Sequence, residues 1–199
     1  AALRYLTRAA ELVPEYALAQ LLLGQAFARK GLTTFALQAL NHALRLDPSM
    51  HLVHPWLAEV YMHTDQPRAA EKHYVAMLSI PGYETRAYAG LGDVARAENR
   101  MEDAVAHYRA VLAIEPREKI PMRMLAASLA ALGRNDEVVA TFSDYLARVP
   151  DDDDVREIRA DVLAAIGRND EAAADWDVLI RRRPADAQGH ARIAVLEEQ

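Results

Sequence analysis

The chain has 199 residues, of which 52% are hydrophobic and 26% are charged, and its formal net charge is -6. A length of this order allows one or two ordinary cores, or one elongated array of small units. Nucleic-acid binding is disfavoured, because a phosphate-binding surface needs lysine and arginine in excess, so we expect no nucleic-acid partner. Alanine is abundant and there are only three phenylalanines, which favours helix over sheet.

The sequence contains no cysteine. Disulfides, thiolate catalysis and cysteine-ligated zinc are therefore excluded, and cytoplasm and periplasm both stay open as compartments. No apolar run approaches the roughly 18 residues of a membrane-spanning helix, so we expect no membrane span. The chain starts without methionine in a stretch that reads as helix, and we expect it to be a fragment of a longer protein.

Prolines mark a period of 34 residues along the chain: Pro14, Pro48, Pro116, Pro150 and Pro184 fall on it, and Gly82 takes the missing place. A fixed period of this length indicates an array of helical repeats. In chain order, the sequence predicts the second helix of a pair over 1–16, full helix pairs over 17–50, 51–84, 85–118, 119–152 and 153–186, and a first helix over 187–199. Such a pair cannot bury its apolar face alone, so we expect neighbours to stack into a single array over 1–199.

Small and bulky residues occupy fixed columns of this repeat. The small column is Gly24, Ala58, Gly92, Ala126, Ala160 and Ala194, and the bulky column is Leu6, Leu40, Tyr74, Tyr108, Phe142 and Trp176. Small residues let two helices approach closely while bulky side chains fill the remaining gap. The position before the small column holds Leu or Ile except at Arg159, which predicts a rotated helix in that unit.

These columns resemble the tetratricopeptide repeat. Tyr88, Leu91, Gly92, Ala104, Tyr108 and Pro116 match its pattern, as do Gln20, Leu23, Gly24, Phe27, Ala36, Leu40 and Pro48. The resemblance covers the whole chain and implies an all-α fold, an α-solenoid of antiparallel helix pairs wound into a right-handed superhelix.

The turn inside each helix pair is expected at Gly31, Asp65, Asn99, Gly133 and Gly167, because Gly, Asn and Asp tolerate the left-handed conformation that closes a helix. The pentapeptide Gly-Arg-Asn-Asp-Glu occurs twice, starting at Gly133 and at Gly167. We interpret it as such a turn, in which glycine ends one helix, asparagine caps the next and the acidic pair occupies its first turn.

Two motifs could indicate ligand chemistry. Gly90 and Gly92 fit a relaxed dinucleotide fingerprint, but that motif must follow a strand and the sequence predicts helix there. His51 and His54 share a helix face and could ligate zinc, but a zinc site needs a third and fourth converging ligand. We therefore predict no metal site and no cofactor.

Asp151 to Asp154 and Arg181 to Arg183 look like an acidic cluster answering a basic one. In the repeat frame the aspartates begin one helix and the arginines end the next, where each charge is favoured by the helix macrodipole. The sequence also carries no recognised catalytic motif, so we nominate no catalytic residues and expect a protein that is not an enzyme.

The resemblance implies a protein or peptide ligand lying in a concave groove lined by the first helix of each pair. The candidate groove residues are Leu18, Leu21, Leu22, Gln25, Leu52, Trp56, Glu59, His63, Arg86, Asp93, Arg96, Arg123 and Met124. Trp56 is the main candidate, because it precedes the packing residue Leu57 and an exposed tryptophan is a typical binding anchor. The alternative is that Trp56 packs against the first helix of the neighbouring unit.

The leading hypothesis is a protein-interaction scaffold that forms part of a larger bacterial protein or assembly, since alanine, arginine and aspartate are all frequent. One alternative is the regulatory or substrate-recruiting array of a larger enzyme, such as a glycosyltransferase, sulfotransferase or oxygenase. Another is a periplasmic scaffold of envelope or exopolysaccharide export. The terminal half repeats would expose apolar faces, and we expect these to promote end-to-end self-association.

Overall fold

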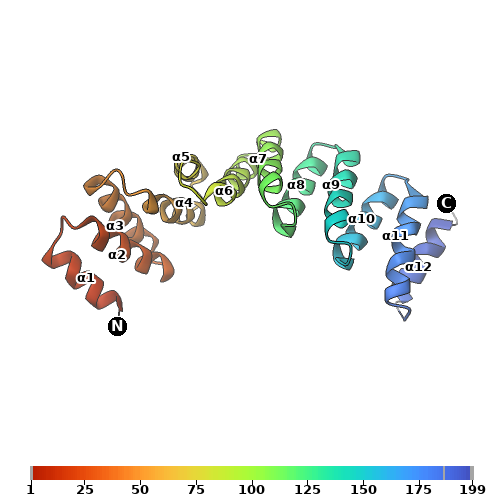
Figure 1. Ribbon diagram of the computed structural model, residues 1–199, viewed down its shortest axis with the longest axis horizontal. Coiled ribbons are helices and arrows are strands. Elements are labelled where there is room, and N and C mark those ends of the chain that lie inside the picture. The colour runs from red at the N-terminus through yellow and green to blue at the C-terminus, as the bar shows by residue number, and fades with distance from the viewer. Residues whose placement is uncertain (1, 186, 198–199) are drawn as a thin grey trace. The chain divides into compact units, whose positions relative to one another are not determined.

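The computed structural model describes residues 2–185 and 187–197, and all regular structure in these ranges is helical (Figure 1). The helices are α1 (Ala2–Leu12), α2 (Ala17–Arg29), α3 (Thr33–Leu46), the 3-10 helix η1 (His51–Val53), α4 (His54–His63), α5 (Pro67–Met77), α6 (Glu84–Ala97), α7 (Met101–Ile114), α8 (Lys119–Ala131), α9 (Asn135–Arg148), α10 (Asp153–Ala165), α11 (Asn169–Arg182) and α12 (Ala187–Glu197). Residues 1, 186, 198 and 199 of the predicted array lie outside the described residues.

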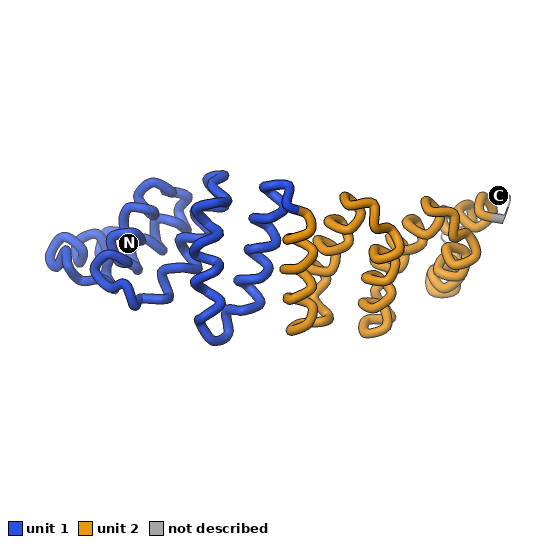
Figure 2. Tube along the Cα trace, turned by 90° about the horizontal axis from the view of Figure 1, so that it is seen from above, with its two compact units in different colours: residues 1–100 blue, residues 101–199 orange. Residues whose placement is uncertain are grey.

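The chain divides into two compact units, residues 1–100 and residues 101–199 (Figure 2). In unit 1, α2 packs on α3, and α4 packs on α5, which in turn contacts α6. In unit 2, α8 packs on α7 and α9, and α10 packs on α9 and α11. The predicted repeat 85–118 has one helix in each unit, so the single array over 1–199 stays a prediction.

The turns predicted inside the helix pairs are confirmed. Gly31, Asp65, Asn99, Gly133 and Gly167 all have a positive φ, between 54° at Asp65 and 77° at Gly167. Asp65 and Asn99 adopt a conformation that most side chains avoid, but that short polar side chains tolerate. Proline placement agrees, since Pro55 and Pro67 lie in the first turns of α4 and α5, where a missing N–H costs little.

The predicted asparagine cap is wrong. Asn135 is the first residue of α9, and the residue before it, Arg134, occupies the N-cap position without a side-chain cap bond. Arg134 instead forms an ion pair with Glu137, from Nε to Oε1 at 2.5 Å and from Nη2 to Oε2 at 2.8 Å. The second copy of the pentapeptide repeats this contact from Arg168 to Glu171. The repeated letters therefore make a turn held by an Arg–Glu pair.

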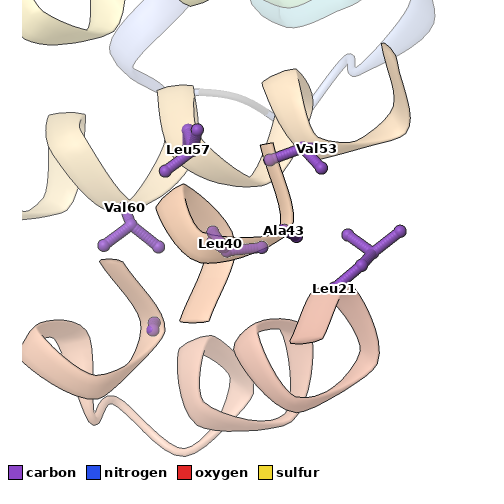
Figure 3. Packing of buried hydrophobic residues seen from close by; sticks show 7 residues of the cluster. Leu21, Leu40, Ala43, Val53, Leu57 and Val60 are labelled. Atoms are coloured by element: carbon purple, nitrogen blue, oxygen red, sulfur yellow. The ribbon is translucent and has the colours of Figure 1, made fainter. Parts of the chain in front are cut away.

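The core of unit 1 joins three successive helices. Its buried cluster contains Leu21 of α2, Leu40 and Ala43 of α3, Val53 of η1, and Leu57 and Val60 of α4 (Figure 3). Gly24 lets α3 come close, because a Cβ atom there would stand 2.6 Å from Cγ of the fully buried Leu40. The predicted meeting of small and bulky columns is therefore observed here.

Gly90 allows a side chain of the preceding helix to approach the backbone of α6. A Cβ atom at Gly90 of α6 would lie 2.2 Å from Cε1 of Tyr74 on α5, so the tyrosine ring rests directly on the α6 backbone. The glycine that could have been read as part of a nucleotide loop is a packing position.

Gly90→Ala should lower the free energy of unfolding by about 1–2 kcal/mol, because displacement of the Tyr74 ring outweighs the gain of about 1 kcal/mol in helix propensity. The measurement is a double-mutant cycle in urea with Tyr74→Ala. In the Tyr74→Ala background the same Gly90→Ala change should stabilise. Equal effects in both backgrounds would show that the ring does not depend on the glycine.

Candidate functional site

The first helices of unit 1 form a small cavity. It has a volume of about 150 Å³ and lies between α2 and α4, with walls from Arg29, Trp56, Glu59 and His63 among others. Its lining is mainly apolar, contributed by Ala28, Val60 and the tryptophan ring. A cavity of this size accepts one small apolar group. Trp56, Glu59 and His63, three of the predicted groove residues, are therefore brought together.

Trp56 combines features of both interpretations offered for it. The ring is half-buried and packs against the unit 1 core, as the alternative required. The guanidinium carbon of Arg29, on the preceding first helix, lies 5.2 Å from the ring centroid, close enough for a cation–π contact. The same ring also forms part of the cavity wall, so it can contact a ligand.

A charged cluster continues this surface from α4 to α6. Glu59 of α4 accepts a hydrogen bond at 2.9 Å from Nη2 of Arg86 on α6. Tyr74 is close enough to these charges to be affected by them. Burial raises the pKa of its hydroxyl to about 12, and the Asp93 carboxylate raises it further. His63 is fixed by a 2.7 Å contact from Nδ1 to the carbonyl oxygen of Glu59. Glu59, with its partner Arg86, and His63 define a polar border beside the apolar cavity.

The apolar candidates divide into exposed and buried. Leu18 is 41% exposed, Leu22 40% and Leu52 53%. Leu18, Leu22, Gln25 and Arg29 are three or four residues apart and therefore form one stripe on α2 that ends at the cavity. The prediction for Leu21 is corrected: it is 3% exposed and belongs to the core, in the buried cluster that also contains Leu40 of α3 and Val53 of η1.

The remaining candidates lie apart from the cavity. Asp93 and Arg96 are on α6, exposed and half-buried respectively, and neither lines the cavity. Arg123 and Met124 are on α8 of the other unit, where Arg123 is exposed and Met124 is half-buried.

The histidines of unit 1 pair differently from the sequence interpretation. His54 contacts His73 of α5, with Nδ1 to Nδ1 at 3.0 Å, and Tyr61 stacks on the His73 ring at a centroid distance of 5.6 Å. Burial lowers the pKa of His73 to about 4, with a further contribution from His54. Among residues 2–185 and 187–197, no group of three or more His, Asp or Glu side chains could hold a metal ion.

Comparison with known families decides the kind of repeat. Two models of the tetratricopeptide repeat match the sequence, one over residues 1–51 and the other over residues 95–162. The chain belongs to the tetratricopeptide repeat (TPR) family. A comparison with curated proteins finds no match.

Solved TPR structures share the fold. YrrB, described as a TPR protein with an unusual peptide-binding site, aligns with a TM-score of 0.70 and 19% identity over 94% of this chain and 97% of its own. A crystal structure of MamA aligns with a TM-score of 0.73 and 16% identity over 88% and 96%. PilF of Pseudomonas aeruginosa aligns at 0.62 and 19% over 90% and 88%. The fold is an all-α TPR solenoid.

Arg159 occupies a repeat position that holds leucine or isoleucine in the other units, and it forms a buried ion pair there. Arg159 of α10 donates two hydrogen bonds to the carboxylate of Asp175 on α11. Its Nε lies 2.7 Å from Oδ2 and its Nη2 lies 2.5 Å from Oδ1. Its Nη1 also donates to the Ser143 hydroxyl at 2.9 Å, which ties α10 to α9. Asp175 is 3% exposed, and Arg156 adds a third contact at 3.3 Å. The arginine that predicted a rotated helix is thus compensated by an aspartate on the partner helix.

The Asp151–Asp154 cluster does more than favour a helix start. Only Asp152 caps α10, accepting a bond from the Val155 N–H at 3.1 Å. Arg182 binds Asp151 at 2.9 Å and Asp153 at 2.7 Å, so the two clusters do meet. The macrodipole interpretation was therefore incomplete, and these contacts fasten the end of α11 to the start of α10.

Proposed function

We propose that this chain is a non-catalytic protein-interaction scaffold that binds an extended, apolar peptide segment on the first-helix face of unit 1, the surface formed by α2, α4 and α6. The observation that carries the proposal is the cavity between α2 and α4, whose wall includes a half-buried tryptophan stacked on Arg29. Aromatic residues with an apolar pocket beside them are the usual anchors of protein interfaces.

The exposed leucines extend this anchor into a surface. Leu18 and Leu22 stand in one stripe with Arg29, and Leu52 is exposed in η1. Contiguous exposed apolar side chains favour a protein partner over a small polar molecule. The TPR neighbour YrrB, whose description names a peptide-binding site, supports the same class of ligand. The Glu59–Arg86 pair would then border the segment with charges that are already matched.

No helix within residues 2–185 and 187–197 is long and apolar enough to cross a membrane.

We also propose that the chain associates end to end through its terminal half repeats. Sedimentation over a wide concentration range tests it, and a strictly monomeric chain would contradict it.

Peptide selection tests the binding surface. A displayed random-peptide library is enriched on the wild-type chain, and the enriched peptides are then measured against Trp56→Ala and against Ile120→Ala. Ile120 is a matched control, since it is 72% exposed and lies on α8 of the other unit. We expect Trp56→Ala to weaken binding at least about tenfold, as truncation of an aromatic anchor costs more than about 1.4 kcal/mol. Ile120→Ala should leave binding unchanged.

Unchanged binding by Trp56→Ala would contradict the proposal. If the enriched peptides bind Trp56→Ala as tightly as the wild type, the first-helix face of unit 1 is not the binding surface. Circular dichroism of both variants separates this result from a loss of fold.

A further inference from the structure

A second cavity lies in unit 2. It has a volume of about 320 Å³ and is lined by residues of the second helices α7 and α9 and of the first helix α8. Its floor is apolar, with Leu112, Met122, Leu125 and Tyr145 among the lining residues. This cavity belongs to unit 2, and none of its lining residues is part of the unit 1 surface on which the proposed function rests.

The repeat shows how the lining of this cavity differs from the equivalent place in other units. Thirty-four residues further on, between α9, α10 and α11, the positions of Leu125 and Thr141 hold Arg159 and Asp175, which bind each other. In unit 1, the positions of Met122 and Thr141 hold His54 and His73, which are also in contact. The α8–α9 junction carries no such polar pair. The small Thr141 turns its hydroxyl to the carbonyl oxygen of Glu137 at 2.7 Å. A cavity of about 290 Å³ is also present where Arg159 and Asp175 pair, but its wall carries that ion pair, whereas the cavity at α8 keeps an apolar floor.

The charges at the mouth of the cavity are unevenly matched. Arg134 already binds both carboxylate oxygens of Glu137, so Arg109, which reaches Glu137 as well, is not needed to neutralise it. On the opposite helix, Arg148 donates to the carbonyl oxygen of Asp144 in its own helix at 2.5 Å. Among the described residues, Arg148 forms no ion pair. Arg148 thus has donors available for an incoming carboxylate, whereas Arg109 is already paired with Glu137.

We propose that this cavity binds a peptide segment in which a bulky apolar side chain, such as leucine or phenylalanine, is adjacent to a carboxylate. The apolar side chain lies on the Met122–Leu125 floor, and the carboxylate binds Arg148. An apolar cavity of about 150 Å³ already holds a benzene molecule, so one of about 320 Å³ admits an aromatic side chain with its neighbours. The Asp144 carboxylate, also at the mouth, opposes an acidic segment and lowers its affinity.

Methionine methyl NMR on the full chain tests the proposal. Met122 lies on the cavity floor, whereas Met124 on the same helix does not line the cavity and serves as an internal control. The probes are three peptides with blocked ends: Ser-Glu-Leu-Phe-Glu-Ser, the same peptide with lysine for both glutamates, and the same peptide with alanine for leucine and phenylalanine. We expect the first peptide to shift the Met122 methyl signal and to leave that of Met124 in place.

Affinity differences identify the groups involved. The lysine and alanine peptides should bind at least about tenfold more weakly, a difference of about 1.4 kcal/mol. Arg148→Ala should weaken the first peptide by a similar factor, Ala140→Phe should abolish its binding by filling the cavity, and Asp144→Asn should strengthen it. Each variant is first checked for an unchanged circular dichroism spectrum.

Three results would overturn the proposal: no Met122 shift at millimolar peptide, equal affinity for the lysine peptide, or a shift of Met124 alone. The last result would place the peptide on the first-helix side. Because Trp56 lies in unit 1, failure here leaves the proposed function untouched, and loss of that function leaves the Met122 result unaffected.

Discussion

Asp175→Ala is expected to destabilise unit 2 by about 3–5 kcal/mol, because it leaves two guanidinium groups without their carboxylate in the interior. The side chains of Arg156 and Arg159 are only 12% and 19% exposed, so water cannot replace the lost partner well. Hydrogen exchange of α10 and α11, combined with urea denaturation, measures the loss. Helical repeats unfold partly one by one, and the change should therefore be concentrated in these helices.

Two comparisons make this prediction specific. Asp177, two residues further on, is 58% exposed and forms only a 3.8 Å contact with Arg181, so Asp177→Ala should cost less than about 0.5 kcal/mol. The double variant Arg159→Leu with Asp175→Ala restores the leucine found elsewhere in the column, and it should recover most of the stability. Equal losses for Asp175→Ala and Asp177→Ala would mean that the buried pair contributes nothing beyond a surface charge.

Acid should weaken unit 1 at a pH where carboxylates are still ionised. The pKa of His73 is lowered by burial from 6.5 to about 4, and burial also lowers the pKa of His54. Between pH 6.5 and pH 4, His73 is protonated in the unfolded chain but stays neutral in the folded chain. The stability present above pH 6.5 is therefore lost progressively as the pH falls, by about 2 kcal/mol for His73 after allowance for solvent screening.

Urea denaturation between pH 7.5 and pH 5 measures this effect. His73→Leu should flatten the pH dependence in this range, because a neutral side chain fills the same buried position. His63→Gln is the control, since His63 is exposed and contacts only a carbonyl oxygen of its own helix. If His63→Gln flattens the profile as much as His73→Leu does, the buried histidine pair is not the cause.

Features that depend on a few neighbouring residues could be predicted from the sequence. The turns at Asp65 and Asn99 follow from the tolerance of these side chains for a left-handed backbone, and the helix boundaries follow from the proline period. The failed cap at Asn135 shows the limit of local rules. An asparagine there could have capped α9, but the Arg134–Glu137 ion pair forms at the same turn and the helix begins at Asn135 itself.

Contacts between helices were harder to predict. The His54–His73 and Arg159–Asp175 pairs join residues 19 and 16 apart on different helices, so no single helix pattern contains them. A signal existed in the repeat frame, since Asp175 is the only acidic residue in the column of Ala39, His73, His107 and Thr141, and it occurs in the same unit where arginine replaces leucine. Two unusual residues in facing columns of one repeat indicate a compensating pair.

The candidate site was partly predictable for the same reason. The family resemblance placed Leu18, Leu21 and Leu22 together on the groove face. Leu18 and Leu22 are exposed, whereas Leu21 is buried in the cluster that joins α2 to α3, η1 and α4, and a contact between helices of this kind cannot be read from one helix alone. Trp56 contacts Arg29 of another helix and the core cluster of unit 1, and neither contact can be read from its own helix.

Site-specific photocrosslinking tests the central claim most directly. A photoreactive residue is placed at Leu22, which is 40% exposed on α2, or at Val75, which is 53% exposed on the second helix α5 of the same unit, and the chain is expressed in cells of its source. Binding on the first-helix face predicts a discrete crosslinked protein from position 22 that is absent from position 75 and disappears with Trp56→Ala. A crosslinked protein from position 75 alone, or one from position 22 that is insensitive to Trp56→Ala, would contradict it.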